Sequence, residues 1–73
     1  MTMYEVRLTG WKRGVRTVSL IELIRRSTDM SLKNSKRVVE DLLAGKAHTF
    51  SFTQSDEATI FREALADLGV QTE

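Results

Sequence analysis

A chain of 73 residues that contains no cysteine has to be held together by one small hydrophobic core. A domain of this size buries only about 60% of the surface that its unfolded chain exposes, so the core is thin. Disulfides and thiolate metal sites are excluded, and His48 with scattered carboxylates is a poor set of zinc ligands. We therefore expect one domain over residues 1–73, with no metal and no cofactor.

The sequence shows no segment that would place the chain in a membrane or direct it to export. No apolar run approaches the about 20 residues that span a bilayer. The first eight residues alternate between polar and apolar types and do not form a signal-peptide core. Together with the absence of cysteine, this predicts a cytoplasmic protein.

Two periods of hydrophobicity alternate along the chain. A period of two residues predicts strands over residues 3–9 and 47–52, and residues 70–72 can add a short last strand. A helical period predicts helices over residues 20–27 and 32–44, and a third one that ends at Gly69. The order strand, helix, helix, strand, helix, strand predicts an α+β domain in which three helices cover one face of a three-stranded antiparallel sheet.

Local signals set the expected ends of the helices. Ser19 and Glu22 have the spacing of a capping box, which predicts the start of the first helix. Ser31 is the candidate N-cap of the second helix, and Thr53 or Ser55 that of the third. The helical positions expected in the core are Leu20, Ile21, Leu23, Ile24, Leu32, Val38, Val39, Leu42, Leu43, Ala58, Phe61, Ala64, Leu65 and Leu68.

The net charge of +1 hides an uneven distribution of charge. Residues 1–46 hold ten Lys or Arg and five Asp or Glu, a net charge of +5. Residues 47–73 hold one Arg and five acidic residues, a net charge of −4. Such a split predicts one basic and one acidic face on the folded domain. A basic face favours the acidic surface of another protein as the partner and, less strongly, a phosphate backbone.

Residues 16–25 read Arg-Thr-Val-Ser-Leu-Ile-Glu-Leu-Ile-Arg, and residues 28–36 read Thr-Asp-Met-Ser-Leu-Lys-Asn-Ser-Lys, followed by Val39 and Glu40. This pattern resembles the C-terminal domain of the bacterial ribosomal stalk protein. That family has an apolar helix with a basic residue near its end, then Thr-Gly-Leu-Gly-Leu-Lys-Glu-Ala-Lys and, shortly after, Val-Glu. The matching positions in this chain are Arg25, Thr28, Leu32, Lys33, Lys36, Val39, Glu40, Ala58, Leu65 and Gly69.

The resemblance implies a non-enzymatic protein-binding module with the same order of elements. In that family the exposed face of the first two helices recruits translation factors through basic residues. The corresponding residues here are Arg25, Lys33 and Lys36, and Arg37 extends the group on the second helix. The implied partner is a protein with an acidic surface, such as a translation factor, bound by a monomer or weak homodimer.

The chain departs from the family at several positions. Glu22 stands where the family has a lysine, which reverses one charge in the implied contact, although Glu22 can pair with Arg25. Asp29 and Ser31 replace two glycines of the turn between the helices. The 73 residues hold no counterpart of the family's dimerisation domain and hinge, so we expect a stand-alone domain and not the stalk protein itself.

The fold also resembles that of the protease adaptor ClpS, whose residues fit less well. That family binds an N-terminal amine with an Asn-Asp-Asp type of turn after the first strand and a histidine on the second helix. Here residues 9–11 are Thr-Gly-Trp and the second helix contains no histidine. We therefore do not expect recognition of N-terminal degradation signals.

Trp11 is a further candidate contact residue. It is expected in a loop with Lys12, Arg13 and Arg16, where an exposed Trp could anchor a protein or stack on a base. The alternative, which we favour, is that Trp11 folds over the edge of the core. A small nucleic-acid-binding protein that uses this loop is our second hypothesis, and a homodimer formed through the open face of the sheet is the third.

No catalytic constellation is expected. His48 has no second His and no Cys beside it, and the adjacent carboxylates of Asp56 and Glu57 point in different directions on a helix. Gly10 and Gly14 lack the spacing of a phosphate-binding loop. The sequence therefore predicts that the protein is not an enzyme.

Overall fold

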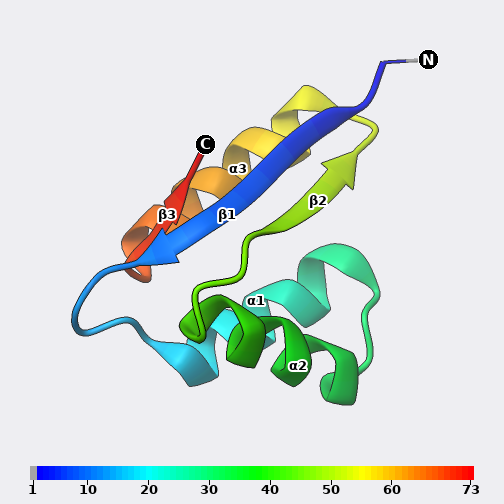
Figure 1. Cartoon of the computed structure of the whole chain (residues 1–73). Coiled ribbons are helices and arrows are strands. Elements are labelled where there is room, and N and C mark those ends of the chain that lie inside the picture. Colours follow the sequence, from blue (N-terminus) through cyan, green and yellow to red (C-terminus); the bar gives the residue numbers. More distant parts are fainter. Residues whose placement is uncertain (1) are drawn as a thin grey trace.

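The structure, a computed structural model, describes residues 2–73. Its elements follow in the order β1 (Tyr4–Trp11), α1 (Thr17–Thr28), α2 (Leu32–Leu43), β2 (His48–Phe52), α3 (Ser55–Asp67) and β3 (Val70–Thr72), as Figure 1 shows. This confirms the α+β class and the β-α-α-β-α-β order. In the described part of the chain, no helix has the length and apolar character needed to cross a bilayer.

The three strands form one antiparallel sheet in the order β2-β1-β3. The central strand β1 pairs with β2 in an uninterrupted register, from Tyr4 opposite Phe52 to Leu8 opposite His48. The ladder between β1 and β3 is irregular between Leu8 and Gly10. The sheet therefore has two edge strands: β2, which pairs regularly with β1, and β3, which pairs with β1 irregularly.

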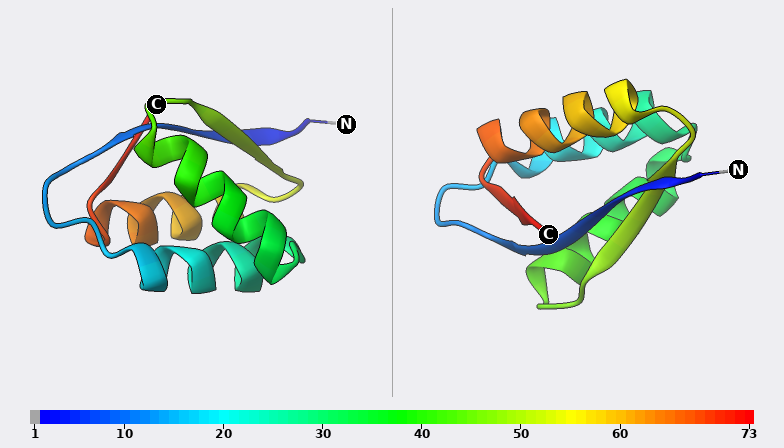
Figure 2. Two further views of the ribbon diagram at one scale, coloured as in Figure 1. Left: turned by 60° about the horizontal axis from the view of Figure 1, so that its bottom comes forward. Right: turned by 90° about the horizontal axis from the view of Figure 1, so that it is seen from above.

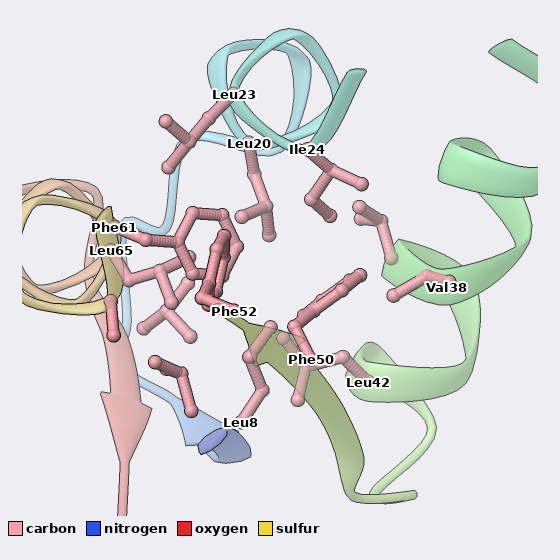
Figure 3. Close-up of a cluster of buried hydrophobic side chains, with 14 residues drawn as sticks. Leu8, Leu20, Leu23, Ile24, Val38, Leu42, Phe50, Phe52, Phe61 and Leu65 are labelled. Carbon is pink, nitrogen blue, oxygen red and sulfur yellow. The ribbon is translucent and has the colours of Figure 1, made fainter. Parts of the chain in front are cut away.

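The three helices pack against one face of this sheet. Figure 3 shows the core with the strands on one side, α1 opposite them, and α2 and α3 on the two flanks; Figure 2 gives two further views of the layers. The other face is polar, with an ion pair of 3.5 Å between Arg7 and Glu73. The buried core consists of Val6, Leu8, Leu20, Leu23, Ile24, Val38, Val39, Leu42, Phe50, Phe52, Ala58, Phe61, Leu65 and Val70.

Phe61 of α3 occupies a central place in the core and is only 1% exposed. Its ring centroid lies 5.3 Å from that of Phe50 and 5.1 Å from that of Phe52, both on β2. Aromatic pairs at such distances contribute about 0.5–1.5 kcal/mol beyond the burial of their area. One side chain therefore fastens α3 to an edge strand of the sheet.

The first helix begins three residues earlier than the sequence predicts. Thr17 is its first residue, so Ser19 lies inside the helix and forms no capping box with Glu22. The N-cap is Arg16, whose side chain makes no capping hydrogen bond. Its backbone N–H instead donates to the carbonyl of Leu68 at the end of α3, over 3.1 Å. A tertiary contact thus takes the place of the expected local signal.

The predicted caps of the other two helices had different outcomes. Ser31 caps α2, because its hydroxyl accepts a hydrogen bond of 3.2 Å from the backbone N–H of Asn34. The N-cap of α3 is Gln54, which makes no capping hydrogen bond through its side chain, so the prediction of Thr53 or Ser55 was wrong. Two acidic side chains in the first turn of α3 complement its dipole instead.

Trp11 and Leu32 also lie elsewhere than expected. Trp11 is the last residue of β1, paired with Val70, because the pairing with β3 extends the strand beyond the predicted residue 9. Leu32 was expected in the core and is 43% exposed. It is the first residue of α2, and Met30 just before it packs against the core in its place.

The turn between α1 and α2 contains one residue in the left-handed region. Asp29, the C-cap of α1, has a φ of 55°. Glycine adopts this conformation without steric strain, and Asp is among the few other residues that tolerate it. Position 29 therefore requires a residue that tolerates a positive φ, and Asp29 meets this requirement in place of glycine.

Candidate functional site

Three cations gather on the solvent side of α2. The helix buries Ser35, Val38, Val39 and Leu42 against the core. Lys33, Lys36 and Arg37 are exposed, and their i, i+3, i+4 spacing places them on neighbouring turns of one side. We call these three residues the basic face. The sequence predicted this arrangement, because the apolar spacing of α2 fixes which side remains in solvent.

The basic face surrounds a shallow surface depression. Its lining consists of the three cations together with Asn34 and Glu40. Although Glu40 lies on the same side of the helix, no carboxylate in residues 2–73 comes within 4.0 Å of a basic-face nitrogen. The positive charge of this surface is therefore not neutralised by a fixed ion pair.

The place of Lys33 is unfavourable for the helix that carries it. It lies in the first turn of α2, where the helix dipole has its positive end and favours acidic side chains. This helix has no acidic residue in its first turn and no basic residue in its last turn. The stability of the helix therefore gives no reason for a cation at this position.

Arg25 of α1 is paired with Glu22. Nη1 of Arg25 lies 3.5 Å from Oε1 of Glu22, one turn earlier on the same helix. Both side chains are well exposed to solvent, so the pair contributes only about 0.3–0.5 kcal/mol to folding. The pair places a carboxylate beside the guanidinium and reduces what Arg25 adds to a basic surface.

The cations of α1 do not extend the basic face. Arg25 lines a depression that shares no residue with the one on α2. Arg26 lines grooves between α1 and α3, beside Glu57 and Asp67. The structure therefore divides the predicted patch, and the basic face on α2 is the largest cluster of unpaired cations that it brings together from the predicted residues.

Trp11 is half-exposed at the end of β1, with 43% of its surface accessible. Lys12, Arg13 and Arg16, the three cations that follow it in the sequence, are exposed. The backbone N–H of Lys12 donates to the carbonyl of Gly69 over 2.7 Å, which ties the segment after Trp11 to the end of α3. Trp11 is thus held in place at the edge of the sheet and still offers part of its ring to a partner.

His48 contacts an aromatic ring of the core. Its ring centroid lies 4.6 Å from that of Phe50, and in residues 2–73 no hydrogen bond joins it to a carboxylate. Asp56 and Glu57 lie in the first turn of α3, both exposed. In this part of the chain, no three His, Asp or Glu residues lie close enough together to hold a metal ion.

Val18 is a candidate contact residue that the sequence analysis missed. It is 75% exposed, more than any other large apolar side chain described. Its spacing from Glu22 and Arg25 is i, i+4 and i+7, which places all three on one side of α1. The helical spacing opposite Leu20 and Ile24 was the available signal, but the predicted helix began too late to include Val18.

Comparisons of the chain with models of protein families, with curated proteins and with solved structures find no match. The resemblance to the stalk C-terminal domain therefore rests on the sequence pattern around residues 16–40 and on the order of the elements.

Proposed function

We propose that this chain is a non-enzymatic protein-binding module whose basic face docks on an acidic surface of another protein. The supporting observation is that Lys33, Lys36 and Arg37 are exposed together without an ion-pair partner in residues 2–73. Exposed charges that are not neutralised within the fold suit the electrostatic steering of a partner.

Apolar contacts beside the cations support the same proposal. Charge sets the rate and specificity of docking, whereas buried apolar side chains supply much of the affinity. Leu32 is exposed and lies one turn before Lys36 on α2, and Val18 offers an apolar contact on the side of α1 that carries Glu22 and Arg25. A partner that covers the basic face would therefore also bury Leu32.

The class of partner follows from the resemblance to the stalk domain. That family recruits translation factors through positions that correspond to Arg25, Lys33 and Lys36, so a translation factor in the cytoplasm is the proposed partner. The ion pair of Glu22 with Arg25 neutralises the side of α1 that carries these two residues. The part of the partner that faces α1 would then be neutral or carry a cation of its own.

The test compares two double variants of equal charge. Lys33→Glu/Lys36→Glu reverses the basic face, and Lys12→Glu/Arg13→Glu reverses two exposed cations after β1. Both change the net charge by the same amount, so unspecific attraction falls equally. Wild type and both variants are immobilised and exposed to nuclease-treated lysate and to purified translation factors. We expect only the first variant to lose the captured factor, with both variants melting close to wild type.

Two results would contradict the proposal. Equal losses in both variants would show that capture depends on net charge alone, and unchanged capture by the α2 variant would place the site elsewhere. As a further check, Glu22→Lys should strengthen the binding of the translation factors that the stalk family recruits, because it restores that family's charge.

The half-exposed ring of Trp11 among Lys12, Arg13 and Arg16 supports a second candidate, the binding of single-stranded nucleic acid. Binding to an oligonucleotide would then weaken steeply with salt, because each phosphate contact releases a counterion. It would also be lost in Trp11→Ala and in the Lys12→Glu/Arg13→Glu variant, and kept in the α2 variant. Measurement of oligonucleotide affinity at several salt concentrations distinguishes the two candidates.

A further inference from the structure

The two edges of the sheet differ in how they are protected. The β3 edge is three residues long and its ladder with β1 is irregular. The guanidinium of Arg62 donates to the backbone carbonyls of Glu73, over 3.0 Å, and of Glu5, over 3.3 Å, just beyond the end of β3. A short strand, an irregular ladder and a nearby charged side chain all hinder pairing with another chain. The β3 edge is therefore blocked.

The strand at the β2 edge is longer, regular and free of charged residues. It is five residues long, His48–Phe52, and contains neither proline nor Asp, Glu, Lys or Arg. Its register with β1 is uninterrupted, and aromatic and β-branched residues suit a strand. In the described part of the chain β2 is an edge strand, on the opposite side of β1 from β3, as Figure 1 shows. Its outer side therefore presents a row of unpaired backbone groups.

A groove keeps this edge accessible. One wall of the groove is formed by residues 48–53 and the other by the turn between α1 and α2, residues 27–30, and Glu57 of α3 also contributes to the lining. An incoming strand would lie about 4.8 Å from β2, in the plane of the sheet, and would continue it. Within residues 2–73, no further strand pairs with the outer side of β2.

We propose that two copies of this chain pair antiparallel through β2 and form a homodimer with one continuous sheet. A two-fold axis at Phe50 places the two Phe50 residues opposite each other. It also pairs His48 with Phe52 and Thr49 with Ser51 across the interface. None of these pairs brings like charges together, and aromatic pairs and Thr–Ser pairs are stabilising across antiparallel strands.

A second copy fits this edge because an antiparallel strand pair is self-complementary. The pairing uses the open β2 edge of both copies and leaves only the two blocked β3 edges outside. Association therefore stops at a closed dimer and does not continue into a fibre. This dimer differs from the third hypothesis of the sequence analysis, because it uses the edge of the sheet and not its open face.

Thr49 and Ser51 allow a test that leaves the core intact, because both are exposed. The Thr49→Lys/Ser51→Lys and Thr49→Glu/Ser51→Glu variants each place like charges opposite one another in the dimer. Within one copy, position 49 lies opposite Arg7 and position 51 opposite Glu5. Each variant thus gains one opposite-charge neighbour and one like-charge neighbour, which balances the effects on the monomer.

Sedimentation equilibrium from micromolar to near-millimolar protein measures the association. We expect wild type to show a monomer–dimer equilibrium and each variant alone to associate at least about tenfold more weakly. An equimolar mixture of the two variants should restore the dimer, because Lys and Glu then face each other. A wild type that remains monomeric throughout, variants that dimerise like wild type, or a mixture that stays monomeric would each overturn the proposal.

Hydrogen exchange gives a second measurement that needs no variant. In the dimer, the outward backbone N–H groups of β2 are bonded to the second copy, so their protection should rise with protein concentration. The N–H groups of β3 should show no such rise. Protection of β2 that does not depend on concentration would overturn the proposal even if a substitution destabilised the fold.

Discussion

The helices α2 and α3 both bury one side in the same core, but their charges are arranged in opposite ways. α3 carries Asp56 and Glu57 in its first turn, where the dipole favours acidic side chains. α2 carries Lys33 in its first turn and has no acidic residue there. The charges at the start of α3 thus favour its helix, whereas Lys33 at the start of α2 does not.

The same contrast holds for the cations on the two helices. Arg62 of α3 donates to the carbonyls of Glu5 and Glu73 and so ties the helix to the ends of two strands. Lys33 and Lys36 of α2 have no comparable bond within residues 2–73. A cation that is used inside the fold is unavailable to a partner, and this difference directs the proposed function to α2.

The largest loss of stability should come from a charge placed on the buried side of α2 or of α3. A buried unpaired charge costs several kcal/mol, comparable to the whole stability of a small domain. We expect Val39→Asp on α2 and Leu65→Asp on α3 each to abolish cooperative unfolding. Ile60→Asp is the control, because Ile60 is 66% exposed. Circular dichroism melts measure this, and a Val39→Asp melt within a few degrees of wild type would show that α2 is not held by this residue.

The acidic start of α3 should matter measurably for stability. Asp56→Lys/Glu57→Lys places two cations at the positive end of the helix dipole, which should lower the free energy of unfolding by about 1–2 kcal/mol. Glu63→Lys, in the middle of the same helix, is the control and should change it much less. Urea denaturation at low salt measures both. Equal effects of the two variants would show that the dipole does not explain the charges of α3.

A smaller change, this time a gain in the free energy of unfolding, is expected from a substitution on the buried side of α2. Ser35 is fully buried, and its hydroxyl has no hydrogen-bond partner among residues 2–73. The corresponding small buried residue of α3 is Ala58, which has no hydroxyl to leave unpaired. Ser35→Ala should therefore raise the free energy of unfolding by about 1 kcal/mol. Denaturant melts measure the gain, and a loss of stability would show that the hydroxyl is hydrogen-bonded in solution.

The smallest effect concerns the basic face itself. Lys33→Glu replaces an unfavourable charge at the helix start and places a carboxylate one turn before Arg37, so it should stabilise the fold by about 0.5 kcal/mol. Lys36→Glu, which lies further into the helix and places a carboxylate one turn before Glu40, is the comparison and should lower the free energy of unfolding by about 0.2–0.5 kcal/mol. The same denaturant melts apply. A clear loss of stability in Lys33→Glu would mean that this lysine serves folding after all.

Most of the fold could be predicted because its signals are local. Val6 and Leu8 alternate with exposed polar residues, as do Phe50 and Phe52, and this pattern marks the buried sides of two strands. Helical spacing identified the buried side of α2 and with it the three cations on the other side. The hydroxyl of Ser31 was a valid cap signal, because the cap bonds a backbone N–H only three residues away.

The candidate site could be predicted only in part. The basic face follows from α2 alone, so the sequence was sufficient for it. Whether Arg25 and Arg26 join that face depends on how α1 lies between its neighbours, and here Arg26 lines grooves beside α3. The exposure of Val18 could not be predicted, because local signals indicated a start of α1 three residues later than the one in the structure.

The sequence by itself determined the order of the elements and the side of each that is buried, because both follow from periodicity within short segments. The tertiary structure decided where α1 begins and where β1 ends. Arg16 is bonded to Leu68, and Trp11 is paired with Val70, so both boundaries depend on residues near the other end of the chain. The unequal protection of the two sheet edges arises in the same way, because no local pattern encodes contacts between segments far apart in sequence.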